Sequence, residues 1–177
     1  GVFGDRHRRG TVEHFDLDNQ PIVRVGTLSK AIGCLGGFVA GPHNLIDFLY
    51  NKARTQIYST ALPATICAAA YHAFEAIQKN TVSSEKLHRL GDTFRQQLDA
   101  CRIEFAKGSC GPIVPILVNK ADAAARASEK LKLDGFFVPA IRPPTVPEGT
   151  SRLRISLCAD HTGEQILRLV SSLKEVL

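Results

Sequence analysis

The sequence predicts an α/β protein in two parts, and three observations lead to this fold class. Short apolar runs rich in β-branched residues alternate with segments whose apolar residues recur at helical spacing. A polar stretch without that periodicity, residues 78–86, indicates a domain boundary, which we place between residues 78 and 79. The second part, residues 79–177, then alternates strand and helix patterns closely, as small α/β domains do.

The first part, residues 1–78, is expected to begin with two short strands and a helix. Residues 21–29 are an apolar run that predicts a buried strand, and residues 35–41 predict a second strand. Pro42 is expected in the first turn of the helix, where proline is common. The apolar face of that helix consists of Leu45, Ile46 and Leu49.

A second helix of this part is expected after Pro63, following an extended segment at residues 55–60. Its apolar residues are three and four positions apart, which places them on one helical face. They are Ile66, Ala69, Ala70, Ala73, Phe74 and Ile77.

The second part is expected to contain three strands and three helices. The strands are predicted at residues 112–118, 135–141 and 152–157. The first helix has an apolar face made of Leu87, Leu90, Phe94 and Leu98, and the second is the alanine-rich segment 121–133. Residues 142–150 contain three prolines and predict a stiff loop.

The last helix has the clearest start signal in the chain. Thr162 and Gln165 have the spacing of a capping box, in which each side chain bonds the other residue's backbone N–H. One apolar face comes next, made of Ile166, Leu169, Val170 and Leu173.

Composition and charge exclude several classes of partner. No run approaches the roughly 18 apolar residues of a membrane span, so no membrane partner is expected. The net charge of +5 includes a basic cluster at Arg6, His7, Arg8 and Arg9, which a nucleic acid or another anion would attract. No aromatic residues interleave with the cluster as a base-stacking surface requires, so a solvated turn is favoured and no nucleic-acid partner is expected.

Cysteine, histidine and methionine usage adds three expectations. The five cysteines are dispersed, odd in number and lack a CxxC pair, which favours reduced thiols in a cytoplasmic protein. The six histidines have no metal-ligand spacing, so no metal site is expected. The chain has no methionine and opens on GVFGDRHRRG, which indicates a part of a longer polypeptide.

Lys30 is the foremost candidate for chemistry. It lies just after a predicted buried strand among small residues, and partial desolvation there would lower the pKa of its amine. A neutral amine is what a Schiff base with an aldehyde cofactor requires. The hydroxyls of Thr27 and Ser29 just before it suit a phosphate group. The alternative is an ordinary loop lysine, with the nearby glycines serving turns.

Arg152 and Arg154 are the second candidates. In the strand RLRISL the period of two places both arginines on one face and the leucines and isoleucine on the other. Paired guanidinium groups suit a carboxylate, although a solvated strand face is an equally simple interpretation. Ser59 and Thr60, before a helix, suit a phosphate or serve as caps.

Three segments, in chain order, resemble the α-oxoamine synthases: VGTLSKAIGCLGGFVAG, IYSTALP and AIRPPTVPEGTSRLRISL. These are pyridoxal 5'-phosphate (PLP) enzymes of the aspartate aminotransferase-like fold, fold type I. The resemblance implies that residues 1–78 are the end of the PLP-binding large domain and residues 79–177 the small C-terminal α/β domain.

The resemblance implies four cofactor-binding residues. Lys30 matches the lysine that forms the Schiff base and later moves the substrate's α-proton, and Thr27 matches a phosphate-binding hydroxyl. Ser59 and Thr60 match residues that reach the cofactor phosphate of the neighbouring subunit, which implies a homodimer with shared active sites. Ser29 departs from the family glycine at its position, a substitution that other members tolerate.

Two further matches concern the substrates. Arg154 matches the arginine that holds the amino acid's carboxylate, and Thr145 matches a residue near the acyl substrate. The loop IRPPTVPEGTSRLR is most similar to members that condense L-alanine with a pimeloyl thioester, on CoA or a carrier protein, with loss of CO2. The alternatives are another pair, such as glycine with acetyl-CoA, and a non-catalytic basic fragment.

The resemblance also implies that part of the site lies elsewhere. GVFG resembles the residues directly after an Asp-x-Ala-His segment in the family, so the aspartate on the pyridine nitrogen and two cofactor-contacting histidines are expected upstream of Gly1. The isolated chain is therefore expected to be inactive.

Overall fold

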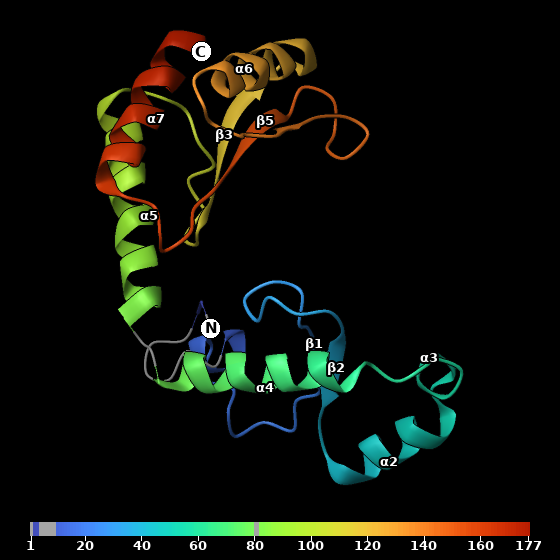
Figure 1. The fold of residues 1–177 in the computed structure, drawn as a ribbon. Coiled ribbons are helices and arrows are strands. Elements are labelled where there is room, and N and C mark those ends of the chain that lie inside the picture. The colour runs from blue at the N-terminus through green and yellow to red at the C-terminus, as the bar shows by residue number, and fades with distance from the viewer. Residues whose placement is uncertain (1, 4–9, 80–81) are drawn as a thin grey trace. The chain divides into compact units, whose positions relative to one another are not determined.

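The structure is a computed structural model that describes residues 2–3, 10–79 and 82–177. It divides into two compact units, Gly1–Thr81 (unit 1) and Val82–Leu177 (unit 2) (Figure 1). The predicted basic cluster at Arg6, His7, Arg8 and Arg9 lies outside the described residues. Within the described ranges, no helix is both long and apolar enough to cross a bilayer.

Unit 1 contains a two-stranded ribbon and four helices among its described residues. The strands are β1 (Arg24–Thr27) and β2 (Gly37–Ala40), and the helices are α1 (Thr11–His14), α2 (His43–Lys52), α3 (Arg54–Ile57) and α4 (Ala64–Lys79). β1 and β2 are antiparallel, with Val25 opposite Val39 and Gly26 opposite Phe38. The ring of Phe38 meets that of Phe74 on α4, with centroids 6.4 Å apart.

The prediction of a buried strand at residues 21–29 is wrong in both extent and burial. Only Arg24–Thr27 form β1, and Val25 is 79% exposed. Because neighbouring strand residues point to opposite faces, Phe38 faces α4 while Val25 and Val39 face the other way. The described part of unit 1 buries neither of these valines, although their apolar character predicts burial.

Two further predictions for unit 1 need correction. Residues 55–60 are not extended throughout, because Arg54–Ile57 form the short helix α3. A single extended residue, Ala53, separates α2 from α3, so the chain returns to helical geometry at once. Pro42 is the N-cap of α2 rather than a residue of its first turn, and its carbonyl accepts hydrogen bonds from the amides of Leu45 and Ile46.

Unit 2 is a three-stranded antiparallel sheet packed against three helices. The strands, in the order β3-β5-β4, are β3 (Ile113–Asn119), β4 (Ala140–Ile141) and β5 (Ser151–Ser156). The helices are α5 (Val82–Ala100), α6 (Ala121–Leu133) and α7 (Gly163–Val176). The predicted helix at 121–133 is confirmed, and α5 shows that the predicted polar break is helical from Val82 onward.

One hydrophobic core holds unit 2 together. It contains fully buried side chains from all three helices and from two strands, including Phe94, Leu98, Ile116, Leu131, Leu153 and Leu173. Burial alternates along β5 as the sequence predicts, with Leu153 and Ile155 inside and Arg154 exposed. The capping box at Thr162 and Gln165 is present at the start of α7.

The predicted strand at residues 135–141 is wrong for its first five residues, since only Ala140 and Ile141 pair with β5 in a ladder. Pro139 has no N–H to donate, although its carbonyl accepts from Arg154 N–H at 3.0 Å. The carbonyl of Val138 is instead bonded by the hydroxyl of Ser128 on α6, at 2.5 Å.

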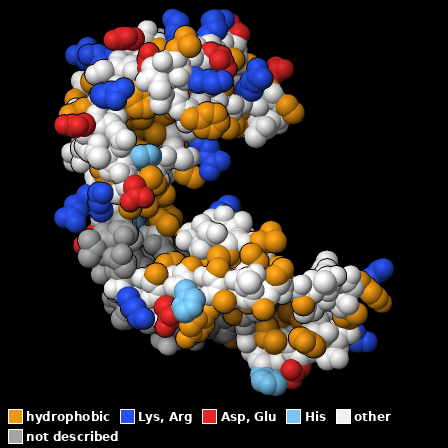
Figure 2. Space-filling view, in the orientation of Figure 1, with side chains coloured by type: hydrophobic (Ala, Val, Ile, Leu, Met, Phe, Trp, Pro, Cys, Tyr) orange, Lys and Arg blue, Asp and Glu red, His pale blue; other side chains and the backbone are white. Residues whose placement is uncertain are grey.

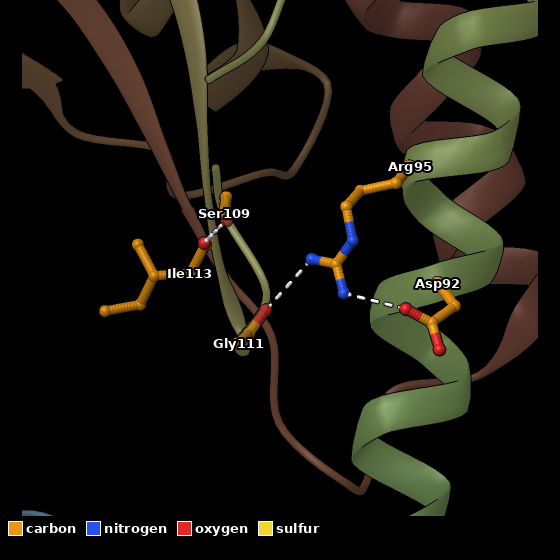
Figure 3. A network of polar contacts seen from close by, with 5 residues as sticks. All are labelled: Asp92, Arg95, Ser109, Gly111 and Ile113. Carbon is orange, nitrogen blue, oxygen red and sulfur yellow. Dashed lines mark hydrogen bonds and ion pairs between the residues drawn. The ribbon is translucent and has the colours of Figure 1, made fainter. Parts of the chain in front are cut away.

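Arg95 fixes the segment that leads from α5 into β3 (Figure 3). Its guanidinium is mostly buried, and it donates to the carbonyl of Gly111 and to Asp92, each at 3.0 Å. The hydroxyl of Ser109 also bonds the carbonyl of Ile113 in this segment. These bonds hold the entrance to β3, and with it the register of the sheet that carries Arg154.

Candidate functional site

Lys30 lies in the loop that joins β1 to β2. Backbone hydrogen bonds close this loop, from Leu28 N–H to the Gly36 carbonyl at 2.9 Å and from Cys34 N–H to the Leu28 carbonyl at 2.7 Å. Gly33 N–H donates to the carbonyl of Lys30 itself at 3.0 Å, which forms a tight turn around the lysine. The loop therefore presents one lysine at the end of a short hairpin.

The side chain of Lys30 is exposed, and the sequence-based prediction of partial desolvation is wrong for the described residues. The prediction assumed that the preceding strand is buried, whereas β1 is itself mostly exposed. The amine is thus accessible to a ligand from outside the chain.

Two hydroxyls stand beside this turn. The oxygens of Thr27 and Ser29 are 2.7 Å apart, within hydrogen-bonding distance. Ser29 N–H donates to Thr27 Oγ1 at 3.1 Å, and Thr27 Oγ1 reaches the Gly36 carbonyl at 3.4 Å. Two hydroxyls and one amine thus lie within four consecutive residues of the chain, a donor set that suits a phosphorylated aldehyde.

Gly36 is required where the loop re-enters the ribbon. Its φ is +112°, and an added Cβ would lie 2.6 Å from Cδ1 of Leu62. The same proximity ties the segment before α4 to the lysine loop. Ser59 and Thr60 precede Leu62 in this segment, and both are exposed.

In unit 2, Arg154 projects from the exposed face of β5. Its neighbour Arg152 is half-buried and donates from Nε to the carbonyl of Thr150 at 3.0 Å. Arg154 has no ion pair or side-chain hydrogen bond within the described residues. Of the two arginines, Arg154 therefore has the guanidinium without a partner among the described residues.

Thr145 lies in the proline-rich loop that precedes β5. Its N–H donates to the carbonyl of Arg142 at 3.1 Å, and its side chain is exposed. A separate pocket of about 320 Å³ lies between residues 135–138, the end of β5 and α7, and neither Thr145 nor Arg154 lines it.

The six predicted residues divide between the two units. Thr27, Lys30, Ser59 and Thr60 belong to unit 1, and Thr145 and Arg154 belong to unit 2. Thr27 is the last residue of β1, and Lys30 lies in the loop that follows it. The role of Leu62 beside Gly36 has no local sequence signal, because the contact joins residues far apart in the chain.

Comparison with known proteins places this geometry in a family. The sequence profile of the family described as aminotransferase class I and II matches residues 1–173. The chain is 44% identical over 178 residues to the 8-amino-7-oxononanoate synthase of Nitrosococcus oceani, and 43% identical over 175 residues to that of Methylobacillus flagellatus. These matches cover 100% and 98% of the chain but 47% and 43% of the relatives, so the chain spans about half their length.

Solved structures agree with the predicted fold class. The 8-amino-7-oxononanoate synthase from Francisella tularensis has a TM-score of 0.86 and 28% identity, covering 98% of this chain and 51% of its own. A structure of SPT (serine palmitoyltransferase) with a PLP internal aldimine has a TM-score of 0.92 and 28% identity, covering 99% of this chain and 44% of its own. The α/β fold of the aspartate aminotransferase type is thereby confirmed.

Proposed function

The chain belongs to the aminotransferase class I and II family, and on that premise we propose that it forms part of a PLP-dependent 8-amino-7-oxononanoate synthase. The observation that carries the proposal is the 44% identity to the Nitrosococcus oceani synthase over the whole chain. The reaction is the decarboxylating condensation of L-alanine with a pimeloyl thioester, on CoA or a carrier protein, in biotin biosynthesis.

The residues around Lys30 fit PLP. The aldehyde of PLP needs an accessible amine, which Lys30 offers. The phosphate of PLP needs hydrogen-bond donors, which the hydroxyls of Thr27 and Ser29 offer. The two strands approach closely beside this loop, since a Cβ added at Gly37 would lie 2.9 Å from the carbonyl oxygen of Gly26. When bound, PLP supplies an electron sink for negative charge at the substrate's α-carbon.

In this proposal, Lys30 performs two tasks. Its Nζ would hold the aldehyde group of the cofactor and, as a free amine, would accept the proton from the α-carbon of alanine as a general base. The hydrogen bond from Gly33 N–H to the Lys30 carbonyl fixes the backbone that carries the Lys30 side chain.

The other residues orient the reactants. Thr27, helped by Ser29, holds the phosphate, and Ser59 and Thr60 reach the phosphate bound by the neighbouring subunit of a homodimer. Arg154 binds the carboxylate of alanine through two parallel hydrogen bonds, for which its free guanidinium is suited. Thr145 lies beside the acyl chain.

We assign unit 1 to the end of the PLP-binding large domain and unit 2 to the small C-terminal domain, with the division between Thr81 and Val82 rather than between residues 78 and 79, which both lie in α4. We place the reaction in the cytoplasm. All five cysteines are free, which supports a reducing compartment.

A hybrid protein tests the proposal. In it, residues 1–177 replace the 178 matched residues of the Nitrosococcus oceani synthase. We expect the purified hybrid to show a visible cofactor absorbance band and to form 8-amino-7-oxononanoate from L-alanine and pimeloyl-CoA, with glycine a poor substitute.

Lys30→Ala in the hybrid should abolish both the borohydride-sensitive band and product formation. Lys174→Ala, an exposed lysine on α7, is the matched control and should leave both unchanged. Retention of the band by Lys30→Ala would contradict the proposal that Lys30 binds the cofactor. A preference for glycine with acetyl-CoA would instead assign the chain to another α-oxoamine synthase.

A further inference from the structure

Two arginines share one face of β5, yet the proposed function uses only one of them. Burial alternates along the strand, so Arg152 and Arg154 lie on the face opposite the buried Leu153. Their backbone positions are roughly 7 Å apart, since each residue of a strand advances the chain by about 3.4 Å. Neither guanidinium forms an ion pair within the described residues. This face therefore carries two positive charges that unit 2 itself does not neutralise.

The guanidinium of Arg152 has its two terminal nitrogens available. Its Nε donates to the Thr150 carbonyl at 3.0 Å, and this side chain makes no other hydrogen bond among the described residues. The Nε bond holds the guanidinium beside the proline-rich loop, residues 142–150, which joins β4 to β5. Nη1 and Nη2 can then donate two parallel hydrogen bonds to one carboxylate. Arg152 is half-buried, which strengthens such bonds because less water competes for the donors.

The neighbours of Arg152 in the sheet are apolar. Arg152 is opposite Leu117 of β3 and Ile141 of β4, and both are half-buried. Residues directly opposite in an antiparallel ladder share a face, with Cβ atoms about 5 Å apart. On the surface of unit 2 that Figure 2 shows, Lys and Arg side chains likewise lie among hydrophobic ones. The surroundings of Arg152 thus suit a ligand with an apolar chain that ends in a carboxylate.

Each substrate of the proposed function carries one carboxylate. Alanine has its α-carboxylate, which is assigned to Arg154, and a pimeloyl thioester has a free carboxylate at the far end of its methylene chain. We propose that Arg152 binds this terminal carboxylate and makes the site specific for acyl chains that end in a negative charge. Leu117 and Ile141 contact the methylene groups next to it. The inference rests on the proposed function and adds to it the residue that selects the acyl substrate.

The position of Thr145 supports this assignment. Thr145, which is proposed to lie beside the acyl chain, belongs to the same loop whose end Arg152 holds through the Thr150 carbonyl. The loop leaves β4 after Ile141 and enters β5 at Ser151, so both of its ends adjoin Arg152 in the sheet. An acyl chain that passes along this loop therefore meets the guanidinium of Arg152.

The terminal carboxylate decides between acyl chains for a physical reason. A heptanoyl chain has the same length as a pimeloyl chain but ends in a methyl group, which would cover the Arg152 guanidinium without giving it a hydrogen-bond partner. A site built to bond a polar group rejects the analogue that lacks this group far more strongly than a site that only measures length. If Arg152 only held the loop in place, its removal would affect both acyl chains equally.

Kinetics of the hybrid protein with two thioesters test the inference. Pimeloyl-CoA and heptanoyl-CoA share the carrier and the chain length and differ in the terminal carboxylate. We expect the unchanged hybrid to prefer pimeloyl-CoA in kcat/KM by at least about a hundredfold. Arg152→Gln should lower kcat/KM for pimeloyl-CoA at least about thirtyfold, mainly through KM, and should leave the value for heptanoyl-CoA within about threefold.

Control variants and a binding measurement make the test specific. Arg126→Gln, at an exposed position of α6, is the matched control and should leave both thioesters unaffected. Arg152→Lys keeps the charge but loses the planar fork, so it should recover part of the preference. Leu117→Glu places a carboxylate opposite Arg152 and should reduce the preference without removing the arginine. Calorimetric titration of each thioester in the absence of alanine should show the same selective loss of binding in Arg152→Gln.

The outcomes separate this inference from the proposed function. A hybrid that has the cofactor band and forms product, but does not prefer pimeloyl-CoA, overturns the inference and leaves the chemistry proposed for Lys30 intact. An equal loss with both thioesters in Arg152→Gln also overturns it, because that result assigns Arg152 to the loop or to a phosphate of the carrier. A hybrid without the band, and without product from either thioester, rejects the proposed function and this inference with it.

Discussion

The charged and the uncharged groups of the candidate site are held differently. All four side chains are exposed, but the hydroxyls of Thr27 and Ser29 bond each other, whereas Lys30 and Arg154 make no side-chain hydrogen bond within the described residues. The sequence selected these residues as candidates, because the segments that carry them resemble a known family. It did not predict the exposure of Lys30. The apolar residues of the preceding strand indicate that the strand favours burial, but they do not show whether another element covers it.

Ser151 offers a test of polar burial in unit 2. Its side chain is 1% exposed, and its hydroxyl has no hydrogen-bond partner among the described residues. Because an unpaired buried hydroxyl is unfavourable, Ser151→Ala should leave the free energy of unfolding unchanged or raise it by up to about 1 kcal/mol. Urea unfolding measures this. Ser156→Ala, at an exposed position of β5, is the control, and a loss above about 1 kcal/mol for Ser151→Ala would contradict the expectation.

Asp122 offers a test of electrostatics in the first turn of α6. A hydrogen bond from Arg126, at 2.7 Å, lowers the pKa of the Asp122 carboxyl below its ordinary value, helped by the backbone N–H of Ala123. The folded-state pKa is depressed, so this contribution to stability is present above the unfolded-state pKa and is lost as the pH falls through the folded-state pKa. An NMR titration should show the low pKa, and Arg126→Ala should raise it. An unchanged pKa in that variant would disprove the cause.

The elements divide into those that local pattern decides and those that it does not. The helix α6 follows from its alanine-rich composition, α7 follows from its capping box and apolar spacing, and the burial of β5 follows its period of two. The helix α3 was missed because four residues cannot show helical periodicity. The strand expected at residues 135–141 consists of Ala140 and Ile141 only, and just before it the hydroxyl of Ser128 on α6 bonds the carbonyl of Val138.

The lysine hairpin is the element on which the candidate site depends. Gly36→Ala combines a φ of +112° with a contact of 2.6 Å to Leu62, whereas Gly33→Ala meets open space at a φ of +68°. In the hybrid protein, Gly36→Ala should weaken cofactor binding at least about tenfold, and Gly33→Ala should weaken it less. Titration of the visible band measures both affinities. Equal affinities for the two variants would show that the Leu62 contact does not position the loop.

At the scale of the whole molecule, the two units differ in completeness. Unit 2 has a continuous core of three helices and one sheet, while unit 1 has two buried hydrophobic residues in its described part. Since apolar burial is the main favourable term in folding, only unit 2 has what an independent domain needs.

Residues 82–177 expressed alone should therefore fold. We expect dispersed amide NMR signals and one cooperative urea transition with a free energy of unfolding of roughly 5–15 kcal/mol. Residues 1–81 alone should show no cooperative transition. Poorly dispersed amide signals for residues 82–177, or a cooperative transition for residues 1–81, would contradict the expectation that only unit 2 folds independently.

The sequence by itself determined the α/β class, the amphipathic faces of the helices and of β5, and the identity of the candidate residues Lys30 and Arg154. These depend on periodicity, on capping residues and on short motifs, all of which are local. Only the tertiary structure decided that Val25 and Lys30 are exposed, that Ser29 bonds Thr27, and that Leu62 packs beside Gly36. Periodicity reports which face of an element is apolar, but whether that face is covered depends on contacts between residues distant in sequence.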